Sequence, residues 1–267
     1  MDRLARTVRE QVALGRLLPL GGTGDAAWIT ESATVHALRR AAAAVPGVRL
    51  GTVALELAEE AAEDTGGAAP GTGVDTAGAA DVDDAAPVGA LPHRPLRIRA
   101  GFEAALDEPL PRTADRLRAA LWATAQDWLG VPVGSVDLAV TGLLDGEPPR
   151  DPVLEGVVVD DGTSVRELGE GPADGGPAAR VEAAALAVPG VLRLTRRLAG
   201  LGAGVRVRDT AAGDGRAAGR GVQLQFAVAA GHRPSVVARA VTAAIRPVAA
   251  ADAPGPVTTA VVVTDTL

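Results

Sequence analysis

The pentapeptide Ala44-Val45-Pro46-Gly47-Val48 occurs a second time, as Ala187-Val188-Pro189-Gly190-Val191. Each copy follows an alanine-rich stretch and precedes an apolar segment. A Pro-Gly pair ends a helix, because proline lacks the N–H of the helical ladder and glycine accepts the left-handed conformation after a last turn. Both copies therefore predict a helix that ends at the Pro-Gly pair, followed directly by a strand.

The segments after the two copies come in the same order. In the first half, apolar residues alternate over 96–104 and 136–140, and a helical stripe at 117–128 lies between them. In the second half the strands are 222–228 and 257–264, again with a helix between them. The predicted fold class is α+β, with two tandem copies of a helix-strand-strand-helix-strand module. We expect a three-stranded antiparallel sheet in each module, with its helix-free face open for modules or chains to meet.

Composition divides the chain further. Residues 58–92 carry eight acidic residues and no arginine, which predicts a disordered acidic insert. Residues 19–27 predict a glycine-rich loop, without the Gly-Lys-Ser/Thr that a phosphate-binding loop needs. The predicted parts are an N-terminal helix (1–18), a first module (28–145) that contains the insert (58–92), a Gly/Ala/Asp-rich linker (146–179) and a second module (180–267).

The overall composition excludes several classes of protein. The 267 residues are 47% hydrophobic, enough to bury a core, and the lack of cysteine excludes disulfides, thiolate metal sites and cysteine nucleophiles. The net charge of −7 resides in the insert, so the near-neutral remainder argues against wholesale nucleic-acid binding. No run approaches the roughly 20 apolar residues of a membrane span. We expect a cytoplasmic protein, with attachment to the inner face of the cell membrane through a partner as an alternative.

Catalytic patterns are missing from the sequence. The three histidines, His36, His93 and His232, fall on a helix, at a linker end and in a turn, away from any serine, second histidine and carboxylate in a recognisable arrangement. Neither a Gly-x-Ser-x-Gly elbow nor a His-Glu-x-x-His zinc motif occurs. The glycines at 200, 202 and 204 precede a strand rather than a helix, unlike a dinucleotide loop. We therefore predict no enzyme and no catalytic, cofactor or metal residues.

One charge cluster is a candidate interaction patch. Residues 191–222 contain seven arginines, two of them Arg216 and Arg220, against Asp209 and Asp214. A solvated face is the favoured interpretation; a basic patch on a small sheet for an acidic protein partner, an anionic lipid surface or RNA, and pairing with the acidic insert, are the alternatives. Binding of RNA is the less favoured function, because no aromatic stacking platform accompanies the arginines. The candidate residues are Arg193, Arg196, Arg197, Arg206 and Arg208.

The second half resembles the alkaline-shock, envelope-stress family of bacterial proteins. The matching features are Val188-Pro189-Gly190-Val191, the strand opened by Gly219-Arg220-Gly221-Val222, the helix after Gly231 and Pro234, and the closing valine strand. The first half matches more loosely, through residues 45–48. The resemblance implies a non-enzymatic scaffold that associates with protein partners, itself or a membrane-anchored protein. The absence of lysine and asparagine indicates a high-GC bacterial genome.

Overall fold

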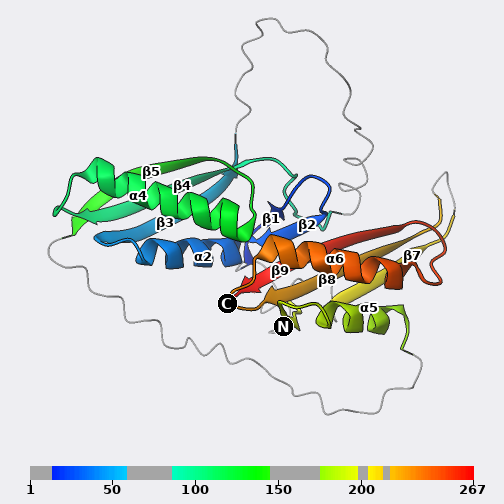
Figure 1. The fold of residues 1–267 in the computed structure, drawn as a ribbon. Helices are drawn as coiled ribbons and strands as arrows, with labels where there is room; N and C mark the ends of the chain where they lie inside the picture. The colour runs from blue at the N-terminus through cyan, green and yellow to red at the C-terminus, as the bar shows by residue number, and fades with distance from the viewer. Residues whose placement is uncertain (1–13, 59–85, 145–174, 198–203, 213–216) are drawn as a thin grey trace, which may run out of the picture.

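A computed structural model of the chain describes residues 14–58, 86–144, 175–197, 204–212 and 217–267. The fold is α+β, as predicted, with two mixed sheets (Figure 1). The elements are β1 (Leu17–Leu20), β2 (Ala27–Thr30), α2 (Glu31–Ala43), β3 (Val48–Leu57), β4 (Leu96–Ala105), α4 (Leu110–Trp122), the π-helix η2 (Ala123–Leu129), β5 (Val133–Leu144), α5 (Pro177–Leu186), β6 (Val191–Leu194), β7 (Val205–Thr210), β8 (Gly219–Val228), α6 (Pro234–Ala250) and β9 (Val257–Thr266).

The smaller sheet has the strand order β3-β4-β5. β3 and β4 are antiparallel, whereas β4 and β5 are parallel, so the prediction of antiparallel sheets is wrong. The reason is the helix between the last two strands: α4 carries the chain back to the end at which β4 began, and β5 then runs in the same direction. The same relation holds in the larger sheet, where α6 connects the parallel strands β8 and β9.

The larger sheet has six strands, in the order β1-β2-β9-β8-β6, with β7 also paired to β8. Its first two strands come from the N-terminal part of the chain, and β2 runs parallel to β9. Leu17 and Leu18 are thus in a strand rather than in the helix expected over 1–18, and Pro19 and Leu20 are not in the expected loop. Residues 1–13 of that helix lie outside the described residues, as do 59–85 of the acidic insert and 145–174 of the linker.

Two helices pack on one face of each sheet. α2 and α4 cover the three-stranded sheet, and α5 and α6 cover the six-stranded sheet (Figure 1). The inward stripe of α4 includes Leu117 and Leu121, both fully buried, and each such side chain contributes about 1.5–3 kcal/mol relative to an exposed one. Phe102 of β4 and Phe226 of β8 are fully buried and belong to one continuous apolar core.

The three-stranded and six-stranded sheets, each with its helices, form two lobes. The lobes meet through helices, α2 against β9 and α6 against η2, and not through the helix-free sheet faces on which we expected modules to meet. Thr30 connects the two lobes, because it is the last residue of β2 in the larger sheet and the N-cap of α2, which packs on the smaller sheet. Its hydroxyl oxygen accepts a hydrogen bond from the Ala33 N–H and its hydroxyl donates to the Thr264 carbonyl of β9. At the other end of this connection, the Gly21 N–H donates to the carbonyl of Gly130, the residue with φ +85° that ends η2.

The repeated pentapeptide forms the same turn in both lobes. Gly47 and Gly190 have φ values of +70° and +94°, in the left-handed region that favours glycine. The carbonyl of each glycine accepts a hydrogen bond of 2.9 Å, from the N–H of Ala105 and Ala229 respectively. The turn therefore ties the start of β3 or β6 to the end of the neighbouring strand.

Both sheets also share one irregularity. The register slips by one residue after Phe102 on β4 and after Phe226 on β8, which leaves Thr141 and Thr264 as extra residues on β5 and β9. The Thr141 hydroxyl donates to the Phe102 carbonyl at 3.1 Å, and the Thr264 hydroxyl donates to the Phe226 carbonyl at 3.3 Å. Each bulge therefore replaces a missing ladder contact by a threonine hydrogen bond.

Replacing these threonines by valine will test what the bulges contribute. Thr141→Val is expected to lower the free energy of unfolding by about 0.5–1.5 kcal/mol. Thr264→Val should cost about 1–3 kcal/mol, because it also leaves the buried Thr195 hydroxyl, 2.8 Å from that of Thr264, without this partner. Urea unfolding measures both, with Thr258→Val on the exposed part of β9 as the control. Equal stability of all three variants would contradict the assignment.

Candidate functional site

The side chains of β7 and β8 alternate between the two faces of the sheet, and this alternation determines to which face Arg206 and Arg208 point. Val205 and Val207 lie opposite Leu224 and Val222, whose side chains belong to the core beneath the helices. Successive strand residues point to opposite faces, so Arg206 and Arg208 project from the helix-free face. They lie opposite Gln223 and Gly221.

Two more of the predicted arginines lie on the same side. Arg193 of β6 is exposed and lies opposite Ala227 of β8. On the other side of β8, Ala227 lies opposite Asp265 of β9. Arg197 forms a 3.7 Å ion pair with that Asp265. We call Arg193, Arg197, Arg206 and Arg208 the arginine face. Arg196, the fifth predicted residue, is exposed directly beside Arg197 in the segment after β6.

The arginine face lacks acidic neighbours on the facing strand. Arg193, Arg206 and Arg208 are opposite alanine, glutamine and glycine. Within the described parts of the chain, these three side chains and Arg196 form no ion pair. Arg197 is the one member of the arginine face for which the described residues supply an ion pair, with Asp265. The margin formed by β6 and β7 thus carries a net positive charge.

The helix-free face of the three-stranded sheet is built differently. Arg49 and Glu103 form an ion pair of 2.8 Å, Arg99 and Glu56 one of 3.7 Å. Arg97 is paired with Asp137 of β5. Arg49 corresponds to Arg193 in position, since each lies opposite the residue that follows Phe102 or Phe226. The same sheet position is therefore charge-balanced in one lobe and unbalanced in the other.

The rest of the helix-free face of the larger sheet is covered by the chain itself. Leu17, Trp28, Ala260 and Val262 form a small buried cluster there, against which Ala86 and Ala90 pack. The segment around residues 86–94 crosses this face, and the Leu91 N–H donates to the Leu17 carbonyl at 2.8 Å. Among the described residues, the arginines of β6 and β7 lie outside this covered part of the face.

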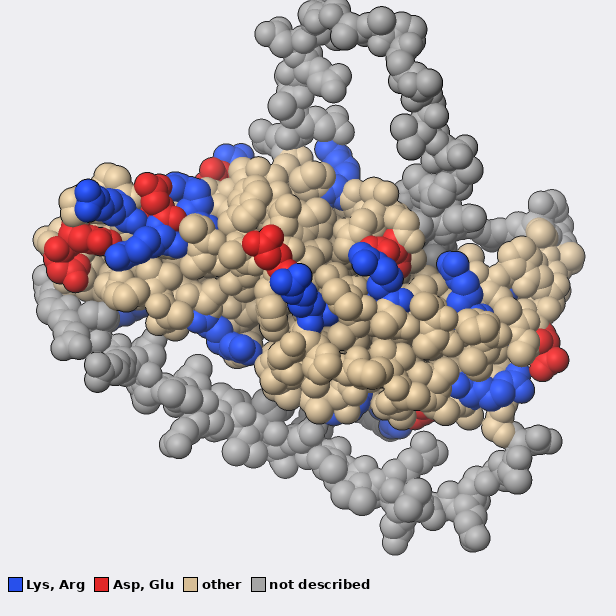
Figure 2. All heavy atoms as spheres, in the orientation of Figure 1, with Lys and Arg blue, Asp and Glu red and all other residues tan. Residues whose placement is uncertain are grey.

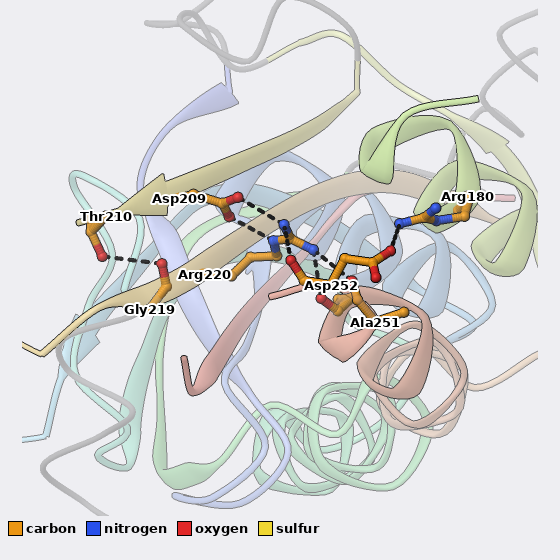
Figure 3. A network of polar contacts seen from close by, with 8 residues as sticks. Arg180, Asp209, Thr210, Gly219, Arg220, Ala251 and Asp252 are labelled. Carbon is orange, nitrogen blue, oxygen red and sulfur yellow. Dashed lines mark hydrogen bonds and ion pairs between the residues drawn. The ribbon is translucent and has the colours of Figure 1, made fainter. Parts of the chain in front are cut away.

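Arg220 does not belong to the interaction patch, although the sequence places it in the same cluster. Its side chain is 3% exposed and lies under the C-terminus of α6 (Figure 3). The guanidinium donates to both carboxylate oxygens of Asp209, at 2.6 and 2.7 Å. It also donates to the carbonyls of Ala249, Ala251 and Asp252, at 3.0 to 3.2 Å. The hydrogen bond raises the pKa of Arg220 and lowers the pKa of Asp209. Its role is structural. Arg216 lies outside the described residues.

Two further ion pairs hold the N-terminal hairpin in place. Burial alone would raise the pKa of Asp25, but the hydrogen bond from Arg239 of α6 lowers it overall, with a contribution from the Gly22 N–H. Burial likewise opposes the effect of Arg16 on Glu31, whose pKa is nevertheless lowered. Both carboxylates are thus held in their charged form by contacts that join elements of the fold.

The three histidines lie in different parts of the fold. His36 and His232 are exposed, on α2 and in the turn before α6, and the ring of His93 lies edge-on against Trp28 with centroids 5.2 Å apart. Among the described residues, no group of three His, Asp or Glu is arranged to hold a metal ion. On the side seen in Figure 2, basic and acidic side chains lie next to one another over the first lobe, between broad uncharged areas.

None of the described helices is long and apolar enough to cross a membrane. The sequence indicated these arginines as a cluster. It did not indicate their contrast with the paired charges of β3, β4 and β5, because that contrast depends on the register between strands. No protein-family model, no curated protein and no solved structure matches the chain.

Proposed function

We propose that the protein is a non-catalytic interaction module that binds an acidic protein segment through the arginine face. The observation that carries the proposal is the contrast between the two lobes. On the smaller sheet, Arg49, Arg97 and Arg99 each have a carboxylate partner on a neighbouring strand. On the arginine face the residues opposite Arg206 and Arg208 are uncharged, so their guanidinium donors are available to external carboxylates.

The proposal includes a tandem organisation of the chain. The matching Pro-Gly turns at Gly47 and Gly190 and the matching bulges at Thr141 and Thr264 support two diverged copies of one module. In this interpretation the first copy keeps a balanced, solvated sheet face, and the second copy has become the binding surface. The resemblance of the second half to the alkaline-shock family supports a scaffold in envelope stress, with a membrane-anchored protein as the partner.

A binding measurement with matched charge variants tests the proposal. The probes are a fluorescent glutamate-rich 20-residue peptide and a single-stranded RNA of the same length, each titrated with the full chain. Arg206→Glu combined with Arg208→Glu is expected to weaken peptide binding by about tenfold or more, because attraction is replaced by repulsion. Arg39→Glu combined with Arg246→Glu changes the total charge equally at exposed positions of α2 and α6, and should leave affinity within about threefold.

The outcomes separate the candidate functions. Equal loss of affinity in both double variants would show that only total charge matters and would overturn the arginine face as a site. Tighter binding of the RNA than of the peptide, lost in the face variant alone, would favour nucleic-acid binding instead. Pull-down from the membrane and soluble fractions of host lysate, with wild type and the face variant side by side, tests the envelope association: an integral membrane protein captured by wild type alone supports it.

A further inference from the structure

The outer edge of β5 is an unpaired strand edge. β5 is the last strand of the order β3-β4-β5, and no described strand pairs with its other side. Such an edge presents a row of backbone N–H and C=O groups that accept another strand. At 12 residues it is the longest strand described.

The corresponding edge of the larger sheet is covered. The bulges align Thr141 of β5 with Thr264 of β9, so Val140 corresponds to Val263. Ile29 of β2 lies opposite Val263, which is 0% exposed. Val140, without such a neighbour, is 47% exposed. The same position of the same arrangement therefore binds a strand in one lobe and leaves an apolar residue in solvent in the other.

Two further exposed apolar residues lie towards the C-terminal ends of β4 and β5. Leu143 of β5 is 51% exposed, and Leu106, just after β4, is 66% exposed. Leu143 lies opposite Ala104, whose side chain is buried in the core, so Leu143 and Val140 are on the helix side of the sheet, beyond the cover of the helices. An edge strand that stays single normally carries charges or proline on its margin. The only charged residue of β5 is Asp137, which is already paired with Arg97, and β5 contains no proline.

We propose that a second copy of this chain occupies this edge, by antiparallel pairing of β5 with β5 about a twofold axis. A twofold axis makes the surface complementary to itself, so that Val140 and Leu143 of one copy cover apolar residues of the other. The charged side chains at β5 are paired: Asp137 with Arg97, and Arg118, whose Nε–H also donates to the Val136 carbonyl at 3.4 Å, with Asp115. The edge therefore neither selects a charged partner nor repels its own copy. The pairing joins two three-stranded sheets into one continuous sheet of six strands. It leaves the arginine face, on the other lobe, exposed in both copies.

Sedimentation equilibrium of the full chain tests the pairing. Wild type is expected to be a dimer at about 100 µM, and Val140→Asp combined with Leu143→Asp a monomer, because a buried unpaired carboxylate at the edge opposes association. Leu186→Asp combined with Val236→Asp is the matched control, at residues of 47% and 54% exposure in the other lobe, and should remain a dimer. A monomeric wild type, or a dimer that survives the edge substitutions, would overturn the proposal.

The cysteine-free sequence permits a second test of the geometry. Single cysteines are introduced at Ser135, Ala139 and Thr141 of β5, and Thr52→Cys on β3 serves as the control. Directly opposite residues of an antiparallel pair have Cβ atoms about 4.5–5.5 Å apart, within reach of a disulfide under mild oxidation. One β5 position is expected to cross-link to its own copy, and Thr52→Cys is not. Cross-linking at Thr52 but not on β5 would contradict the pairing. Because Arg206→Glu combined with Arg208→Glu should leave the dimer intact, failure here is distinguishable from failure of the proposed binding surface.

Discussion

Trp28→Ala is expected to lower the free energy of unfolding by about 3–5 kcal/mol, the usual cost of removing a large buried aromatic side chain. The indole is 1% exposed, in the small cluster on the helix-free face of the larger sheet. Its Nε1–H donates to the Leu91 carbonyl at 3.2 Å, and its ring contacts His93. The substitution thus removes both the packing of β2 and an anchor of the segment that crosses this face.

Urea unfolding followed by far-UV circular dichroism measures the loss. Trp28→Phe is the matched variant, because it keeps most of the apolar surface and removes the N–H; it should cost about 1–2 kcal/mol. The order wild type, Trp28→Phe, Trp28→Ala in decreasing stability supports the assigned packing. An alanine variant no less stable than the phenylalanine variant would show that β2 contributes little to the fold.

Arg220→Leu is expected to lower the melting temperature by roughly 5–10 °C. The guanidinium satisfies three carbonyls at the end of α6, and leucine cannot replace any of those hydrogen bonds. Cationic groups also interact favourably with the negative end of a helix dipole. The substitution therefore loses hydrogen bonds and leaves polar groups of α6 without their partner.

Two further variants in the hydrogen-bond network of Arg220 test how much of the stability loss is due to Arg220 itself. Arg180, with a side chain 42% exposed, forms a 3.3 Å pair with Asp252, so Arg180→Ala should change the melting temperature little (Figure 3). Asp209→Asn keeps an acceptor for Arg220 but removes the charge, and should lie between the other two variants. Differential scanning calorimetry at pH 7 gives all three values. A large loss for Arg180→Ala with none for Arg220→Leu would reverse this assignment.

The long elements of this fold follow from the sequence, because each carries a clear period. The helix expected before the first Pro-Gly pair is α2, which ends at Ala43, three residues before Pro46. β4, β8 and β9 were found where apolar residues alternate. The parallel direction of β5 and β9 was also contained in the sequence, since a helix between two strands of one sheet returns the chain to its starting end. That inference was missed.

The short strands could not be predicted. β1 and β2 have four residues each, and β1 contains Pro19, so neither has a periodic pattern of its own. β2 is stabilised by pairing with β9, more than 200 positions away in the chain, and β1 is stabilised by pairing with β2. No local signal describes such a partner.

The candidate site was partly predictable, because the alternation of side chains within one strand can be read from the sequence, whereas the register between strands cannot. Arg206 and Arg208 alternate with Val205 and Val207, which assigns them to the outward face once the valines are placed inward. Arg220 is in phase with Val222 of the same strand, so its inward position was implied by the same rule. The ion pairs of the smaller sheet could not be assigned, since they depend on which residues of β3, β4 and β5 lie side by side.

The pairing of β2 with β9 has a consequence for how the protein is made. Residues 27–30 leave the ribosome long before residues 261–263. The hairpin of β1 and β2 therefore lacks its neighbouring strand, β9, during most of synthesis. The smaller sheet uses contacts closer in sequence and is complete once β5 has emerged. Contacts between distant residues slow folding, because a long loop must close before they form. The order of translation therefore separates an early-folding lobe from one that is completed only when β9 appears.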